Sequence, residues 1–249
     1  MGWKHEHIVP EEMDLNSEIQ RVALKNHLKR YHVSRKWISG YFNGNKPLIL
    51  DLACGTGFGS EILAEIGDVI GIDINEKSLE YAKTHYNKRN TKYIAGDADD
   101  INFRNKLVKF DAVVSLETIE HLKNHYSYLH WVKKSLYPGG LLIVSFPSTL
   151  TMDWAVPHHK RDISRREANR LFKEIGFKII DTFDQADRIQ LNHVFEERNT
   201  NPDVPAPPLS HWIKYYLKRP DHMFIRLFQI MAKNGILLAH QQYLLTPEK

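Results

Sequence analysis

A glycine-rich turn is the stretch of this sequence whose residue types could bind a small ligand. The apolar run Leu48–Leu52 precedes glycines at alternate positions, Gly55, Gly57 and Gly59, and Asp51 stands just before them. Glycine has no Cβ, so its backbone can adopt a left-handed conformation and approach a ligand closely. A strand that leads through such a turn into a helix aims backbone N–H groups at that ligand. The stretch therefore predicts a nucleotide-like cofactor.

The spacing of the glycines distinguishes between cofactors. The dinucleotide fingerprint requires G-x-G-x-x-G, whereas this turn reads G-x-G-x-G and follows the acidic Asp51. This departure favours a cofactor other than NAD, and an NAD-dependent dehydrogenase is the least favoured enzyme class.

Composition indicates a cytoplasmic protein. The chain has 249 residues, a formal net charge of +4 and a single cysteine, Cys54, which we expect to be a small buried residue of a protein from a reducing compartment. No run of about 18 apolar residues is present, and the residues after Met1 lack the apolar core of a signal peptide, so no membrane span is expected. Basic residues are interspersed with acidic ones, which permits nucleic acid as a partner without indicating it.

Elements that would position the turn follow from hydrophobic periodicity. Short β-branched runs alternate with amphipathic stretches, which is typical of a parallel sheet covered by helices. We expect strands over 48–52, 69–73, 92–95, 110–116, 141–146, 177–182 and 241–245. We expect helices over 60–66, 76–87, 98–107, 126–136 and 164–175, the last opened by a capping box at Ser164. The predicted fold class is α/β, a Rossmann-like, doubly wound, mostly parallel seven-stranded sheet with helices on both faces.

Segments outside this alternation complete the predicted organisation. Residues 1–47 form an N-terminal helical cap with one or two helices over 17–38, and 48–183 form the cofactor-binding core. Residues 184–238 are a helical insertion, aromatic-rich over 211–233, that contacts substrate or a second copy in a homodimer. Residues 239–249 form the last strand and the tail. The irregular stretch 147–162 is expected to be a loop over the strand ends, where ligands bind in open α/β sheets.

Five motifs stand in a fixed order along the core. They are Asp51-Leu-Ala-Cys-Gly-Thr-Gly57, Gly71-Ile-Asp73, Gly96-Asp-Ala98, Phe110-Asp-Ala-Val-Val-Ser-Leu-Glu117 and Leu136-Tyr-Pro-Gly-Gly-Leu-Leu-Ile143. Together they resemble the class I S-adenosylmethionine-dependent methyltransferases over residues 45–183. The resemblance extends to a subgroup associated with sugar and surface-glycan modification and, more distantly, to ubiquinone-pathway O-methyltransferases.

This resemblance implies residues that bind S-adenosylmethionine. Main-chain amides of the turn would reach the methionine portion, and the ammonium would bind Asp51. Ribose hydroxyls would bind Asp73, whose alternative role is a helix N-cap. The residues expected to contact the cofactor are Asp51, Ala53, Gly55, Gly57, Asp73, Ile74, Asp97, Ala98 and Glu117, together with Arg30 and Tyr31 from the N-terminal helix. Of these, Ile74 would pack on the adenine and Asp97 would accept from its amino group.

Residues after the fourth predicted strand are the catalytic candidates. Methyl transfer is an in-line displacement in which alignment is the main contribution of the protein, and a base assists a poorly nucleophilic hydroxyl. We expect His121 to be that base, with Glu120 beside it. A structural or helix-capping role for His121 is the alternative.

A divalent metal is the second possibility for this segment. Glu117, Glu120, His121 and, from the loop, His158 could hold Mg²⁺ or Mn²⁺. The grouping resembles metal-dependent enzymes that methylate the 3′-terminal ribose of small RNAs. No metal is favoured, because E-x-x-E-H also occurs in metal-independent methyltransferases and because the chain lacks a basic block for RNA.

His158, His159 and Arg161 form a basic cluster expected either to bind substrate phosphates, as in a nucleotide-sugar or a lipid-linked glycan, or to be a solvated loop. The sequence thus predicts a methyltransferase that transfers a methyl group to a hydroxyl of a sugar, a glycan precursor or another small metabolite. The alternatives are a metal-dependent RNA 2′-O-methyltransferase and a non-catalytic cofactor-binding subunit of a complex.

Overall fold

The structure, a computed structural model, describes residues 8–105, 108–148, 163–190, 192–193, 209–233 and 235–248. Its strands are β1 (Leu48–Leu52), β2 (Asp68–Asp73), β3 (Thr91–Ala95), β4 (Phe110–Leu116), β5 (Leu136–Pro147), β6 (Phe177–Gln190) and β7 (Gly235–Pro247). Its helices are α1 (Glu18–Phe42), α2 (Phe58–Leu63), α3 (Glu76–His85), α4 (Ile101–Arg104), α5 (His125–Ser135), α6 (Arg165–Ile175), α8 (Leu209–Lys218) and α9 (Pro220–Lys233). Two single-turn 3₁₀ helices, η2 (Pro10–Glu12) and η3 (Ile119–His121), complete the described elements.

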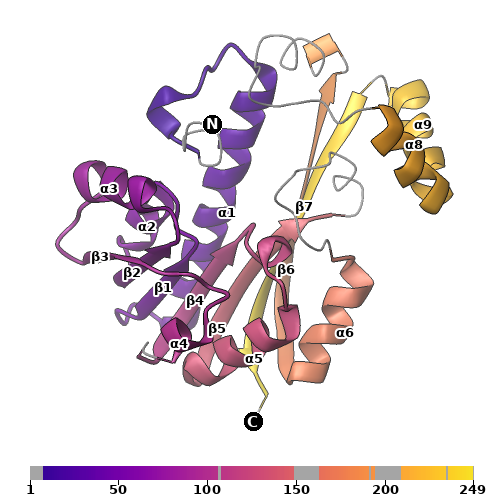
Figure 1. Cartoon of the computed structure of the whole chain (residues 1–249). Coiled ribbons are helices and arrows are strands. Elements are labelled where there is room, and N and C mark those ends of the chain that lie inside the picture. Colours follow the sequence, from indigo (N-terminus) through magenta and orange to yellow (C-terminus); the bar gives the residue numbers. More distant parts are fainter. Residues whose placement is uncertain are drawn as a thin grey trace.

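Seven strands form one sheet in the order β3-β2-β1-β4-β5-β7-β6 (Figure 1). The first five are parallel, and β7 is antiparallel to both β5 and β6. The chain builds outward from β1 to β3 on one side and from β4 on the other, so the order reverses between β1 and β4. The predicted fold class is confirmed.

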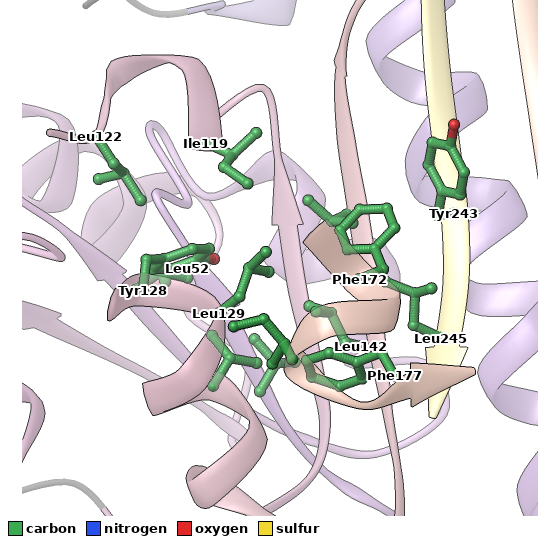
Figure 2. Packing of buried hydrophobic residues seen from close by; sticks show 14 of the residues in the cluster. Leu52, Ile119, Leu122, Tyr128, Leu129, Leu142, Phe172, Phe177, Tyr243 and Leu245 are labelled. Carbon is green, nitrogen blue, oxygen red and sulfur yellow. The ribbon is translucent and has the colours of Figure 1, made fainter. Parts of the chain in front are cut away.

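Both faces of the sheet are covered by helices. On β4, Val113 belongs to a core shared with α5 and α6, whereas Ala112 and Val114 belong to a core shared with α1 and α2. Successive side chains of a strand point to opposite faces, so a continuous apolar strand indicates this double cover. Figure 2 shows the first core, in which Tyr128 and Leu129 of α5 and Phe172 of α6 pack with strand residues such as Leu142.

Local capping signals set the helix boundaries. Ser17 accepts a hydrogen bond from the Gln20 amide at the start of α1, which is one continuous helix and ends at the left-handed Asn43. Ser164 accepts from the Glu167 amide at the start of α6, so the predicted capping-box start is confirmed.

Three strands, β5, β6 and β7, are longer than their apolar runs predict. The predicted helix over 126–136 corresponds to α5, which ends at Ser135, but β5 already begins at Leu136 and the pairing with β4 shifts register there. On the other edge, β6 runs to Gln190 instead of ending at residue 182. Its outer part pairs with β7 up to Gly235 and is mostly polar, so hydrophobicity alone does not reveal this strand.

Helices α8 and α9 lie between β6 and β7 in sequence, as the predicted C-terminal helices do. In space, α9 contacts β7, and the N-terminal helix α1 contacts β6. No helix in the described part of the chain has both the length and the apolarity needed to cross a bilayer.

Candidate active site

The carboxyl ends of β1 and β4 meet where the strand order reverses, which is the usual position of ligand sites in open α/β sheets. Each end carries a non-glycine residue with left-handed backbone, Ala53 at φ 60° and Glu117 at φ 51°. Such a conformation costs of the order of 1–3 kcal/mol and gathers at functional sites. Backbone strain therefore marks both sides of the same point.

The glycine turn follows Ala53 directly. Gly55 and Gly57 have φ values of 55° and 88°. A Cβ on Gly57 would lie 2.6 Å from the Ala82 Cβ and 2.8 Å from the Tyr93 hydroxyl, and one on Gly59 would lie 2.0 Å from the Tyr31 ring. Glycine is thus needed at Gly57 for conformation and space, and at Gly59 so that α1 can pack on α2.

Asp51 lies buried beneath this turn. Tyr31 donates a hydrogen bond to its Oδ1 at 3.2 Å and Ser60 donates to its Oδ2 at 2.6 Å. Burial raises the pKa of Asp51 to about 7, and the charge of Asp73 contributes to the rise, whereas the two hydroxyl donors oppose it. Asp51 therefore joins α1, β1 and α2 through a carboxyl group that is only partly ionised near neutral pH. Cys54, next to it, is buried as expected.

Asp73 ends β2 and holds the turn from the side. Its Oδ2 accepts from the Gly55 amide at 2.8 Å, and its Oδ1 accepts from the Asn75 amide at 2.8 Å. The cap of α3 is the neighbouring Asn75, which accepts from the Ser78 amide, so Asp73 is not the N-cap. Ile74 is 68% exposed directly after β2, an apolar surface suited to covering a flat ring.

Asp97 and Ala98 follow β3. The Asp97 carboxylate is exposed and accepts from the Asp99 amide at 2.7 Å. The Ala98 carbonyl accepts from Arg104, whose guanidinium is buried. The Gly96 amide donates to the Asp73 carbonyl at 2.9 Å, so the ends of β2 and β3 are held side by side. The structure thus brings Asp51, Asp73 and Asp97 to the ends of three neighbouring strands.

Glu117 collects partners from three other elements. Ser145 of β5 donates to its Oε1 at 2.7 Å, the Nε of Arg30 on α1 lies 3.8 Å from Oε1, and the Nε2 of His240 on β7 lies 3.2 Å from Oε2. The Arg30 guanidinium and the His240 imidazole thus both face the Glu117 carboxylate.

Arg30 is the centre of a buried polar network. It is completely buried, and its Nη1 donates to Gln185 of β6 at 2.9 Å. Gln242 of β7 donates to the Arg30 carbonyl at 3.0 Å, and Gln185 donates to the Asn26 carbonyl at 3.2 Å. Within the described residues, the Nη2 of Arg30 has no hydrogen-bond acceptor. Burial, and after it the neighbouring Arg30 and His240, lowers the pKa of His27 well below its usual range.

The sequence analysis did not single out several of these residues. They are Ser145, Gln185, His240 and Gln242. All belong to β5, β6 or β7 and lie far in sequence from α1, so no local sequence motif predicts their contact with it. Residues 183–190 and 240–242 are mostly polar and lack the alternation of a half-buried strand, so hydrophobic periodicity gives no signal for them.

The other predicted residues have different surroundings. Glu120 is buried and His121 is half-buried, both in η3 just after β4. In the ranges that the structure describes, no three His, Cys, Asp or Glu side chains gather as a metal site would require. His158, His159 and Arg161, and with them the His158 of the metal hypothesis, lie outside the described residues.

Comparison with known proteins supports the resemblance that the sequence motifs predict. Residues 50–144 match the model of the methyltransferase domain family. The chain is 28% identical over 140 residues to a protein of Mycolicibacterium smegmatis named as a probable S-adenosylmethionine-dependent methyltransferase, covering 54% of this chain and 53% of that one. It is 32% identical over 138 residues to the ubiquinone biosynthesis O-methyltransferase of Haemophilus ducreyi, covering 53% and 57%. Residues 50–144 therefore resemble a class I S-adenosylmethionine-dependent methyltransferase domain, as the sequence motifs predict.

A solved methyltransferase has the same fold. Magnesium protoporphyrin IX methyltransferase from Synechocystis, with bound S-adenosylhomocysteine, superposes with a TM-score of 0.57 at 20% identity and covers 68% of this chain and 81% of that one. The chain spans about half the length of the two curated methyltransferases that it matches.

The segment that matches the methyltransferase domain contains only part of the site. The matched segment runs from β1 into β5, so it contains Asp51, Asp73, Asp97 and Glu117. Arg30 and His240 lie outside it. The segment that matches the methyltransferase domain therefore contains one side of the site. The other side is formed by segments that lie before and after the match.

Proposed function

We propose that this methyltransferase transfers a methyl group from S-adenosylmethionine to a hydroxyl of a small acceptor, in the class of sugars, glycan precursors and other small metabolites. The observation that carries the proposal is the pair of left-handed residues, Ala53 and Glu117. They flank the switch point, which is the place between β1 and β4 where the strand order reverses, beside Asp73. The O-methyltransferase activity named for the Haemophilus ducreyi relative supports a hydroxyl as acceptor. A single, buried cysteine supports a cytoplasmic location.

The residues present fit the methyl donor. Ile74 offers an exposed apolar face for adenine, and the left-handed turn at Gly55 and Gly57 presents a backbone without side chains beside Asp73. Asp73 would accept the ribose hydroxyls with the lone pairs that Gly55 and Asn75 do not use. Arg30 has a buried Nη2 without an acceptor in the described residues, which suits the donor carboxylate. Asp97 and Ala98 would bind the adenine edge, and Tyr31 and Asp51 would lie at the methionine end.

When bound, S-adenosylmethionine supplies a methyl group activated by a positively charged sulfur. The chain then has to align the acceptor and to take its proton. We assign the proton to His240, because its Nε2 lies 3.2 Å from the Glu117 carboxylate, which would orient the imidazole and stabilise its protonated form. His121, with the buried Glu120 before it, is the rival base.

Titration calorimetry with S-adenosylmethionine and S-adenosylhomocysteine tests the donor site. We expect both to bind the wild type, and Asp73→Ala to lower the affinity at least about tenfold, because it removes the acceptor of the Gly55 amide. Asp97→Ala is the matched control, since the exposed Asp97 bonds only within its own turn, and we expect a smaller loss. Failure of the wild type to bind either molecule would refute the proposal.

Methyl transfer to a panel of acceptors tests the reaction. The panel holds sugars, glycan precursors, phenolic metabolites and short RNA, each assayed with and without EDTA. We expect transfer to a hydroxyl of a small acceptor that survives EDTA. Transfer to RNA that EDTA abolishes would instead support the ribose methyltransferase. Donor binding without transfer to any acceptor would support a non-catalytic subunit.

A further inference from the structure

Helices α8 and α9 expose a large apolar surface. Seven large apolar side chains there are exposed, namely Ile213, Leu217, Phe224, Ile225, Leu227, Phe228 and Met231. Leu217 is 78% exposed and Met231 is 83% exposed, which are values of side chains that project freely from a helix. Large apolar side chains exposed in such number on two neighbouring helices are typical of interaction sites.

The inner face of α9 is polar instead. His222 and Arg226, one turn apart, are 4% and 8% exposed, and the Nδ1 of His222 lies 2.6 Å from the Tyr215 hydroxyl of α8. At 100° per residue, Phe224 and Phe228 lie on the opposite side of the helix from this pair. A surface helix of a globular protein normally turns its apolar stripe to the core. Relative to the part of the chain that the structure describes, α9 is therefore inverted, with its apolar stripe facing outward.

The same segment carries the net charge of the chain. Residues 209–233 contain five of its 34 Lys and Arg and one of its 30 Asp and Glu, which leaves 29 of each elsewhere. Lys214 and Lys218 are exposed and lie one position after Ile213 and Leu217, so on α8 a basic stripe borders the apolar one. Apolar residues edged by Lys are the pattern of a helix in the plane of a membrane interface.

We propose that α8 and α9 dock this protein onto an anionic lipid surface, with the apolar side chains in the acyl boundary and the lysines at the headgroups. A second copy fits the surface less well. A two-fold interface would place each basic segment against its own copy and bring like charges together. Anionic lipid supplies both the apolar environment and the opposite charge. This proposal goes beyond methyl transfer and does not depend on it.

Co-sedimentation with vesicles tests the proposal. We expect the wild type to bind vesicles of phosphatidylglycerol and phosphatidylcholine and to bind pure phosphatidylcholine much more weakly. The triple variant Phe224→Ser, Phe228→Ser, Met231→Ser should lower the partition coefficient at least about a hundredfold, because three exposed apolar groups no longer insert. Lys214→Glu with Lys218→Glu should lower it roughly tenfold or more on anionic vesicles only.

Leu15→Ser and Ile180→Ser are the matched controls, since both residues are exposed apolar side chains of other elements, and binding should not change. Because every substituted side chain is exposed, the variants should fold, which circular dichroism verifies. Wild-type protein that does not bind anionic vesicles would overturn the proposal. A stable dimer that the triple variant abolishes, seen by light scattering, would overturn it in favour of a second copy.

Discussion

The two sides of the switch point differ in the sequence separation of the residues that form them. On the side of β1, β2 and β3, functional candidates stand within a few residues of a strand end and bond to close neighbours, as Asp73 does to Gly55, 18 residues away. On the side of α1, β6 and β7, the contacts join distant segments: Arg30 bonds to Gln185, 155 residues away, and Gln242 bonds to Arg30 over 212 residues.

This difference teaches how such a site divides its tasks. The β1 to β3 side uses backbone amides and short turns, which hold a constant ligand and belong to the segment that matches the methyltransferase family. The α1, β6 and β7 side uses side chains carried on long elements, whose identity can change without disturbing the turns. Fold alone does not fix an acceptor, and we expect the acceptor contacts on this second side.

The largest expected effect tests the buried network. Arg30→Met should lower the free energy of unfolding by about 3–5 kcal/mol, because Glu117 and Gln185 lose their cationic partner inside the protein. Chemical denaturation measures the loss. Adding Glu117→Gln to this variant should recover part of the lost stability, since the carboxylate that Arg30 faced in the wild type is then neutral as well. A loss below about 1 kcal/mol would mean that the network does not hold α1 to β6 and β7.

Turnover decides between the two candidate bases. His240→Ala should lower kcat about 10²–10⁴-fold, because a general base contributes that factor, with the donor Kd unchanged. The acidic limb of the pH profile should disappear with it. His121→Ala, the comparison variant, should change kcat little. The opposite result, a loss in His121→Ala alone, would return the base to the segment after β4.

Glycine substitutions can separate two costs of adding a Cβ, namely the cost of a left-handed backbone conformation and the cost of a steric clash. Gly57→Ala should cost about 3 kcal/mol in stability, since a left-handed φ of 88° and a Cβ 2.6 Å from Ala82 act together. Gly44→Ala is the matched control, because Gly44 has a φ of 82° with open space around it. It should cost only the conformational part, about 1–2 kcal/mol. Equal losses in the two variants would show that the turn is not tightly packed.

Asp51 gives the smallest expected effect, a pH dependence of stability. Burial raises its pKa to about 7 in the folded protein from 3.8, so the folded state binds more protons between these values and stability falls as pH rises. Asp51→Asn should remove about 2 kcal/mol of this fall between pH 5 and pH 7, measured as the difference between urea unfolding of wild type and variant. Identical pH slopes would show that Asp51 ionises as readily as an exposed carboxyl.

The sequence by itself determined the α/β class, four of the five parallel strands near their observed bounds and the strand-end acids. These features depend on local causes: apolar runs of strand length, glycines that permit left-handed turns, and capping residues such as Ser164. Asp51, Asp73 and Asp97 could be placed because the carboxyl ends of parallel strands meet at one edge of a sheet.

Tertiary structure alone decided the partners of Glu117 and the inverted face of α9. His240 reaches Glu117 because β7 runs antiparallel beside β5, and Arg30 reaches it because α1 packs across the sheet toward β6. Neither arrangement leaves a periodic signal in the sequence. Likewise, the helical spacing of Phe224 and Phe228 predicts a helix with an apolar stripe, but only packing shows which side of that helix is turned away from the protein.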